Sequence, residues 1–257
     1  MAVTIKTNEE IATLREGGKR LAYIMSEVVK AVKPGVSTLD LDNLARQLAE
    51  EKGDKPAFLN YKPKGAPRAY PASICISIND EIVHGIPNEN PKILKEGDLV
   101  SLDMGLEHKG LFTDHAVTVG VGQVDEEGQK LMNATKQALV EGIKAIKDGK
   151  YVRDISYAIE KYVRPLRYGI VEELCGHGVG YKVHEDPYVP NYCLESKGER
   201  LKAGMVIALE PMLNEGTKHI TLDEDGYTYR TKDGKRSAHF EHTVVVTKNG
   251  AEILTML

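Results

Sequence analysis

Apolar residues recur at helical spacing in two stretches near the start of the chain. If residues 8–32 form a helix, one apolar stripe along it contains Ile11, Leu14, Leu21, Met25, Val28 and Val32. Thr7 and Glu10 can form a capping box at the start of this stretch. Residues 38–52 show the same spacing and are followed by Gly53, which is typical of the end of a helix. The pattern therefore predicts two amphipathic helices.

Short apolar runs follow these helices and indicate β-strands. The runs in the first half are residues 73–78, 99–103 and 116–121. The second half repeats the order, with helical spacing over residues 126–147 and 152–164 and strand-like runs at residues 169–175, 205–210 and 243–247. We expect an α+β fold in which helices back a curved antiparallel sheet.

Two pairs of strand segments match each other between the halves. Residues 94–103 and 201–210 both read Leu-Lys-x-Gly, then an apolar run, then an acid. Residues 113–119 and 240–246 form the second pair, again with an acid at the matching place. The four acids are Asp103, Asp114, Glu210 and Glu241. Matches that recur in the same order predict structurally related halves.

The repeat has a consequence for domain organisation and for charge. No linker or low-complexity tract divides the chain, so we expect a single domain over residues 1–257. Its internal repeat covers roughly residues 8–125 and 126–250. Related halves would bring the four acids together about a pseudo-twofold axis. Because four like charges cannot share a small buried site without cations, the sequence predicts bound metal.

Three histidines bear on this predicted site. Side chains alternate along a strand, so His115 and His242 point away from the acids that precede them. We interpret both as structural residues or as residues that support the ligands from outside the site. His177 lies between glycines, which let the backbone approach a ligand closely, although a turn with a surface histidine would have the same sequence. Four carboxylates and one imidazole suit two divalent ions, Mn²⁺, Fe²⁺, Co²⁺ or Zn²⁺. Paired ions of this kind activate water for hydrolysis.

The overall composition narrows the class of protein. The chain is 41% hydrophobic and 28% charged, and its net charge of −4 argues against general nucleic-acid binding. Cys75, Cys175 and Cys193 include no Cys-x-x-Cys pair, so we expect neither a disulfide framework nor a thiolate zinc site. The sequence has no apolar run of signal-peptide or membrane-span length. We expect a soluble cytoplasmic protein.

Several motifs together are more specific than any one of them. They are His84-Gly85-Ile86-Pro87, Asp103 with Asp114, Gly176-His177-Gly178-Val179-Gly180 followed by His184-Glu185-Asp186-Pro187, Leu209-Glu210-Pro211-Met212, and Phe240-Glu241-His242-Thr243. Over essentially its whole length the chain resembles the short bacterial type I methionine aminopeptidases of the M24 pita-bread metallohydrolases. The resemblance implies the pita-bread form of the α+β fold. It also implies a dinuclear catalytic domain that removes the initiator methionine when the second residue is small.

The family's ligand roles match five positions of this chain. Asp103 would chelate one ion, and Asp114 and Glu241 would bridge both ions. His177 and Glu210 would complete the other ion. This ligand set is what the resemblance implies for the cluster of acids.

The resemblance also implies residues that handle the substrate. Glu210 would accept the proton of the attacking water, His184 would donate to the scissile carbonyl oxygen, and His84 would lie near the peptide nitrogen. A thioether suits aromatic rings and sulfur, and the expected pocket walls are Tyr61, Tyr70, Cys75 and Tyr227. The chain departs from the family's usual residues at Phe58, Thr113, Val183 and Tyr227. The shape of the pocket is therefore less determined than the chemistry.

Two other functions are compatible with these motifs. A proline-specific aminopeptidase or prolidase on the same fold usually carries an extra N-terminal domain and Glu-Pro-Gly in place of Glu210-Pro211-Met212. Cleavage of Xaa-Pro peptides would favour it. A non-catalytic binding module is the second alternative, although such relatives lose metal ligands. Absence of bound metal at any pH would favour that reading.

The expected partners also follow from the resemblance. We expect nascent polypeptide N-termini as substrates, transient association with the ribosome, no direct nucleic-acid specificity, no membrane contact and a monomer. The basic surface for a ribosome is either Lys62, Lys64 and Arg68 or Lys144, Lys147 and Lys150. A solvated loop or helix face would carry the same charges.

Overall fold

The stretches of helical spacing form the long helices of the molecule. In the computed structural model, which describes residues 3–63 and 65–257, these are α1 (Asn8–Ala31), α2 (Thr38–Glu51), α3 (Glu126–Ala145) and α4 (Val152–Val163), with a 3-10 turn η1 at Arg164–Leu166. The capping box of α1 is confirmed, because Thr7 Oγ1 and Glu10 Oε2 each accept the other residue's backbone N–H. Each helix ends one or two residues earlier than predicted, since apolar spacing does not reveal where the backbone turns.

A nine-stranded antiparallel sheet crosses the described part of the chain. Its strands are β1 (Lys55–Pro56), β2 (Cys75–Ile78), β4 (Leu99–His108), β5 (Leu111–Gly120), β7 (Cys175–Gly178), β8 (Glu185–Pro190), β9 (Val206–Leu209), β14 (Glu241–Val246) and β15 (Ala251–Ile253). The order is β1-β4-β5-β14-β9-β7-β8, with β2 paired to β4 and β15 paired to β14. Strands from the two sequence halves therefore meet where β5 pairs with β14.

Two smaller sheets flank this one. The first consists of β6 (Gly169–Ile170), β10 (Met212–Asn214) and β13 (Ser237–His239). The second consists of β3 (Glu81–Val83), β11 (Ile220–Leu222) and β12 (Tyr229–Thr231). Most of these short strands, and β8, lack an apolar run long enough to be predicted from the sequence.

All six predicted strands differ from the structure in their bounds, and three of them differ by more than two residues at one end. The runs at 99–103 and 116–121 are parts of longer strands, because β4 and β5 pair along their whole length and turn only at Lys109 and Gly110. The run at 169–175 is not one strand. Since β6 pairs with β10 and β7 pairs with β9, its two ends belong to different sheets and the chain bends between them.

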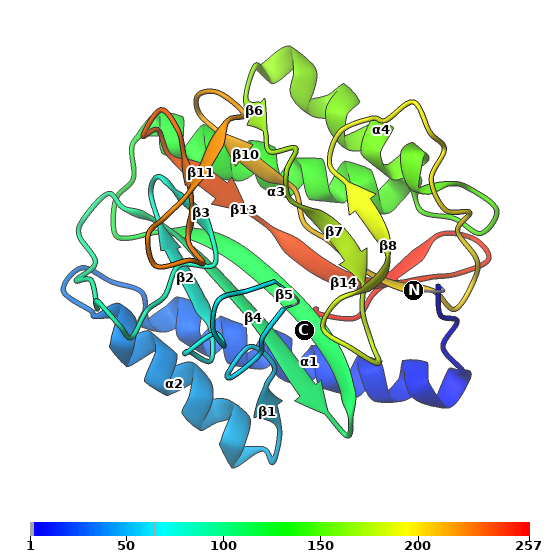
Figure 1. Ribbon diagram of the computed structural model, residues 1–257, viewed down its shortest axis with the longest axis horizontal. Helices are drawn as coiled ribbons and strands as arrows, with labels where there is room; N and C mark the ends of the chain where they lie inside the picture. Colours follow the sequence, from blue (N-terminus) through cyan, green and yellow to red (C-terminus); the bar gives the residue numbers. More distant parts are fainter. Residues whose placement is uncertain (1–2, 64) are drawn as a thin grey trace.

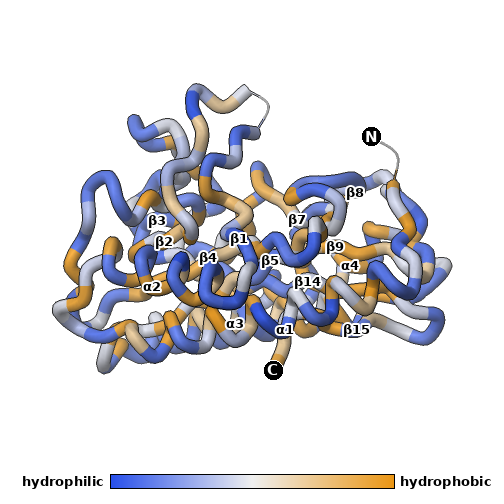
Figure 2. The backbone as a smooth tube through the Cα atoms, turned by 90° about the horizontal axis from the view of Figure 1, so that it is seen from below, coloured by the Kyte–Doolittle hydropathy of each residue, from blue (hydrophilic) through white to orange (hydrophobic). Residues whose placement is uncertain are grey.

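The helices cover one side of the large sheet. Figure 1 shows α1 beside β4 and β5, with α2 next to α1 and β1. It shows α3 beside β13, with α4 next to α3 and β8. In Figure 2 the helices α1, α2 and α3 line one side, while the segment between β1 and β2 and the β7–β8 hairpin lie on the other. This layering agrees with the predicted α+β class.

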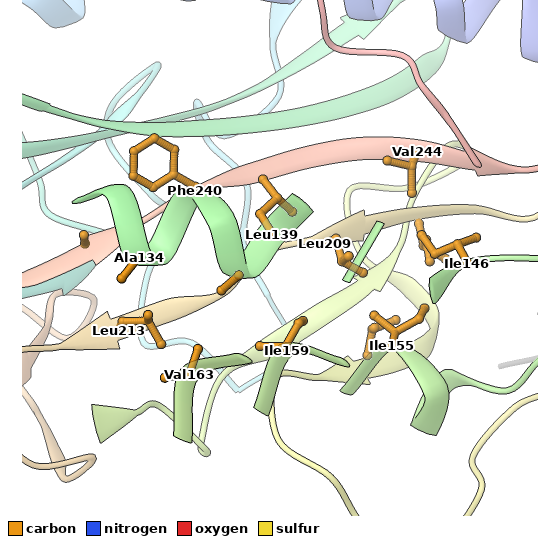
Figure 3. Close-up of a cluster of buried hydrophobic side chains, with 14 of the residues drawn as sticks. Ala134, Leu139, Ile146, Ile155, Ile159, Val163, Leu209, Leu213, Phe240 and Val244 are labelled. Carbon is orange, nitrogen blue, oxygen red and sulfur yellow. The ribbon is translucent and has the colours of Figure 1, made fainter. Parts of the chain in front are cut away.

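Each pair of helices buries its apolar stripe against the sheet. In the second half Leu139 of α3, Ile155 and Ile159 of α4, and Leu209 of β9 belong to one buried cluster (Figure 3). In the first half α1 and α2 form a second cluster with β4. Removing such side chains from water is the main favourable term in folding. The two helix layers thus hold the middle strands rigidly, and the other face of these strands remains available for a site.

Candidate active site

One cavity brings together every residue that the sequence singled out for chemistry. It is lined by Phe58, Tyr61, Pro63, Tyr70, Cys75, His84, Asp103, Asp114, His177, His184, Glu210, Tyr227 and Glu241. These residues come from segments as distant in sequence as β2 and β14. The cavity therefore contains all five expected ligands, both expected substrate histidines and the four expected pocket walls.

The five expected ligands come from five neighbouring strands. Along the sheet order β4-β5-β14-β9-β7, each strand contributes one of them, with Glu210 directly after the end of β9. Ala116 lies opposite Asp103 on one side and opposite Glu241 on the other, and it is two residues from Asp114. Residues that are paired or two apart share a face of a sheet. The three carboxylates on β4, β5 and β14 therefore point the same way.

The pairing of β14, β9 and β7 shows that the last two ligands, His177 and Glu210, lie on the same face. Ala208 lies opposite Thr243 of β14 and opposite His177 of β7. Thr243 is two residues from Glu241, and Glu210 is two residues from Ala208. The alternation of side chains thus places all five ligands on one face of the sheet.

The ligand atoms lie close together and are buried. Asp114, His177 and Glu241 each offer a ligand atom, and these atoms lie within 4.8 Å of one another. His177 Nε2 lies 3.4 Å from Glu210 Oε1. Within residues 3–63 and 65–257, Asp103 Oδ1 and Glu241 Oε1 have no hydrogen-bond partner although both are buried. Such atoms are costly unless a further group satisfies them.

The electrostatics of the cluster point to a cation. Burial raises the pKa of Asp103 to about 7. Burial and then the neighbouring carboxylates raise the pKa values of Asp114, Glu210 and Glu241 well above the ordinary range. Burial lowers the pKa of His177 to about 3, so this imidazole is neutral and able to act as a ligand. The donor set fits divalent metal, which would replace the protons that the carboxylates otherwise hold.

His115 and His242 lie on the opposite face from the acids, as the alternation predicts. Their rings are stacked, with centroids 4.7 Å apart. His115 Nδ1 donates to the backbone carbonyl of Glu241 at 2.5 Å, and His242 Nδ1 lies 3.0 Å from Thr255 Oγ1. The pair therefore supports the backbone of the ligand strands from behind.

The two expected substrate histidines face the cavity from different loops. His184 lies between β7 and β8, with its Nδ1 2.9 Å from the Tyr61 hydroxyl and its ring centroid 4.4 Å from that of His177. His84 follows β3 and has a φ of 61°, a left-handed conformation that is uncommon outside glycine. Burial, and then the proximity of the His184 imidazole, lowers the pKa of His84 to about 4. Both imidazoles therefore approach the carboxylates from outside the ligand set.

An apolar pocket adjoins the carboxylates. The buried cluster there contains Phe58, Tyr70, Ala72, Cys75, Val183 and Tyr227, with Tyr61 packed against it. Tyr70 donates to the carbonyl of Gly85 at 2.8 Å, and its ring meets the ring of Tyr227 edge-on at 5.2 Å. Burial raises the pKa of Cys75 well above its usual range, so the thiol is neutral. The pocket is thus uncharged and contains one sulfur and several aromatic rings.

Sequence reasoning missed two residues of this region. Pro63 lines the cavity, although its neighbours Lys62 and Arg68 were considered only as part of a basic surface or a solvated loop. His239 is buried, its Nε2 lies 3.8 Å from Glu210 Oε2, and neither ring nitrogen has a hydrogen-bond partner in the described part of the chain. The available signal was its position two residues before Glu241, which gives both side chains the same face of an extended strand.

Known proteins resemble this chain in both sequence and fold. Residues 12–248 match the family model described as Metallopeptidase family M24. A methionine aminopeptidase of Aquifex aeolicus is 47% identical over 259 residues and covers 100% of both chains. A methionine aminopeptidase of Thermotoga maritima has a crystal structure with a TM-score of 0.94 at 41% identity, again over 100% of both chains.

More distant relatives share the fold alone. A prolidase of Pyrococcus horikoshii has a TM-score of 0.78 at 22% identity, over 98% of this chain and 63% of its own. The identity to methionine aminopeptidases is about twice as high and extends over whole chains. This chain therefore belongs to metallopeptidase family M24 and, within that family, to the methionine aminopeptidases.

Proposed function

We propose that this protein is a metalloaminopeptidase that removes the initiator methionine from nascent chains whose second residue is small. The observation that carries the proposal is the joint placement of the ligand cluster and the pocket. Four carboxylates and one imidazole share one face of the sheet, and an uncharged pocket with Cys75 and aromatic rings adjoins them. A thioether side chain suits such surroundings.

The metal ligands in this proposal are the five residues on successive strands. Asp103, Asp114, His177, Glu210 and Glu241 would hold two divalent ions, of which Mn²⁺, Fe²⁺, Co²⁺ and Zn²⁺ fit the oxygen-rich set. When bound, the ions polarise the scissile carbonyl and lower the pKa of water. Asp103 Oδ1 and Glu241 Oε1 support this assignment, because both are buried and neither has a hydrogen-bond partner among the described residues.

The protein's own groups move the protons and fix the substrate. The carboxylate of Glu210 would take the proton from the attacking water and deliver it to the leaving amine. His184 would donate from Nε2 to the carbonyl oxygen, because its Nδ1 is engaged with the Tyr61 hydroxyl. In that tautomer Tyr61 is the donor to Nδ1. His84 would contact the peptide nitrogen and help to orient the bond.

Peptide hydrolysis tests the proposal directly. Purified protein with Mn²⁺ or Co²⁺ should release methionine from Met-Ala-Ser much faster than from Met-Lys-Ser. A chelator should abolish the activity, and added metal should restore it. Failure to cleave the first peptide under several metals and reducing conditions would contradict the proposal. Preferential cleavage of Xaa-Pro peptides would instead support the prolidase alternative, for which Met212 after Glu210-Pro211 is unfavourable.

The cellular setting is part of the same proposal. Among the described residues, no helix combines the length and the apolar character needed to cross a membrane. We expect a cytoplasmic monomer that meets nascent chains during transient contact with the ribosome. Two basic surfaces were considered for this contact. In the first, Lys64 lies outside the described residues, and the Arg68 guanidinium already donates to the Glu89 carboxylate at 2.6 Å. Co-sedimentation with ribosomes at low and high salt tests the contact.

A further inference from the structure

The chain before α1 forms an arm that reaches the hairpin carrying His177 and His184. We define this N-terminal arm as residues 3–7 (dark blue beside β8 in Figure 1). The backbone N–H of Lys6 donates to the carbonyl of Gly204 at 2.9 Å. Gly180 has a φ of 138°, and a Cβ there would lie 2.4 Å from Lys6 Cε. The absence of a side chain at position 180 therefore leaves room for the Lys6 side chain against the hairpin.

The arm ends in a buried ion pair with the hairpin. Lys6 Nζ lies 2.7 Å from Glu185 Oε2, and the two side chains are 1% and 6% exposed. Thr4 Oγ1 donates to the same carboxylate oxygen at 2.6 Å and accepts from Lys6 Nζ. A buried charge is strongly unfavourable without its partner, so the arm and the hairpin stabilise each other's position.

The second oxygen of Glu185 holds the loop that carries His184. Oε1 accepts the backbone N–H groups of Tyr181 and Lys182, the latter at 2.9 Å. The ring of Tyr181 lies 4.4 Å from Lys6 Nζ, and its hydroxyl donates to Glu10 Oε1 at 2.8 Å. The Glu185 carboxylate therefore binds Lys6 through one oxygen and the backbone of the turn through the other. Glu185 is the residue next to His184 in the sequence.

We propose that Lys6 is a positioning residue that fixes His184 through Glu185, an inference that rests on the proposed role of His184 in the reaction. Lys6 does not line the cavity. It acts through the turn, because a shift of the loop moves the His184 ring relative to Tyr61 and to the carboxylates. Small displacements of a reacting group are enough to lower the rate strongly.

Lys6→Met tests the proposal, with activity on Met-Ala-Ser in the presence of Mn²⁺ as the readout. The turnover number kcat should fall about 10–100-fold, because a displacement of about 1 Å of a reacting group can cost up to about 10²-fold. KM and bound metal should change little, since the pocket and the five ligands are not touched. Arg15→Met is the matched control: Arg15 of α1 pairs with Glu252 of β15 and its side chain is 39% exposed, so kcat should stay near wild type.

A double-mutant cycle separates positioning from a general structural effect. In a His184→Ala background, Lys6→Met should lower kcat less than about twofold further, because the group that it positions is gone. An equal loss in both backgrounds, or an unchanged kcat in the single variant, would overturn the inference.

If circular dichroism shows that Lys6→Met does not fold, Thr4→Val replaces it in the same cycle, because this change removes one hydrogen bond to Glu185. Wild-type protein without activity, or His184→Ala with wild-type kcat, would instead contradict the proposed function.

Discussion

The ligand cluster and the apolar pocket beside it are built in different ways. The five ligands come from consecutive strands of one sheet and point to the same face through simple alternation. Most walls of the pocket come instead from irregular segments, with Phe58, Tyr61 and Tyr70 before β2 and Tyr227 between β11 and β12. Cys75 connects the two regions, because it lies on β2 opposite Asp103.

This difference separates chemistry from specificity. Strands braced by two helix layers hold charged ligands at fixed spacing, which a metal site requires. Loops tolerate changes of side chain more readily, so pocket walls can vary while the ligands do not. Substitutions in the cluster should therefore abolish turnover, and substitutions in the pocket should alter substrate preference.

The largest effect is expected from Asp114→Asn or Glu241→Gln. Either change removes one negative charge from the cluster and should lower both metal occupancy and kcat/KM. The loss should exceed the roughly 10–100-fold that outer-shell changes usually cause. Metal analysis after dialysis and the rate on Met-Ala-Ser provide the measurements. Near-normal activity in either variant would show that the ligand assignment is wrong.

A smaller effect, confined to turnover, is expected from His184→Ala. Removing one donor to a developing oxyanion typically costs about 10²–10³-fold in kcat. Bound metal and KM should change little, because His184 is not among the ligands. Tyr61→Phe should give a weaker loss of the same kind, since it frees Nδ1 of His184. A change in metal content with unchanged kcat would contradict this division of roles.

Phe58→Ala tests whether the apolar pocket determines which N-terminal residue is preferred. The ring is buried and lines the cavity, so its loss enlarges the space for the N-terminal side chain. One methylene of mismatch in a hydrophobic pocket is typically worth about 1–3 kcal/mol of discrimination, and Phe58→Ala removes a whole ring. We expect kcat/KM for methionine peptides to fall and that for bulkier N-terminal residues to rise, with metal content unchanged. Tyr188→Ala, at a side chain that is 71% exposed, is the control.

The smallest effect concerns pH and stability. Raised carboxylate pKa values, about 7 for Asp103, mean that the folded metal-free protein holds protons that the unfolded chain has released. The contribution of these carboxylates to stability should therefore fall as the pH rises from about 4 through the folded-state pKa. Bound cations replace these protons, so the metal-bound protein should lack this decrease.

The measurement is Tm with Mn²⁺ and with a chelator between about pH 6.5 and pH 8, where histidines with lowered pKa values such as His177 remain neutral. The difference should grow with pH by about 2–4 °C for each kcal/mol. A constant difference would mean that the cluster holds no extra protons when folded.

Much of the ligand set could be derived from the sequence because its signals are local. The matched acids Asp103 and Glu210 end apolar runs, and alternation alone separates Asp114 from His115. By contrast, the run at 169–175 was interpreted as one strand, since nothing local reveals that its two ends join different sheets. The predicted domain limits and internal repeat remain predictions, although helix pairs from both halves pack on the same sheet.

The amino-acid pattern alone is enough to place the helices and the alternation along the ligand strands, and therefore to identify the charged residues on their shared face. Those features depend on the backbone's own periods of 3.6 and 2 residues. Three features depend on how the whole chain packs: which loop side chains line the pocket, the 3.8 Å distance between His239 and Glu210, and the pairing of Lys6 with Glu185. Such contacts join residues far apart in the chain, and only packing in three dimensions brings them within reach of one another.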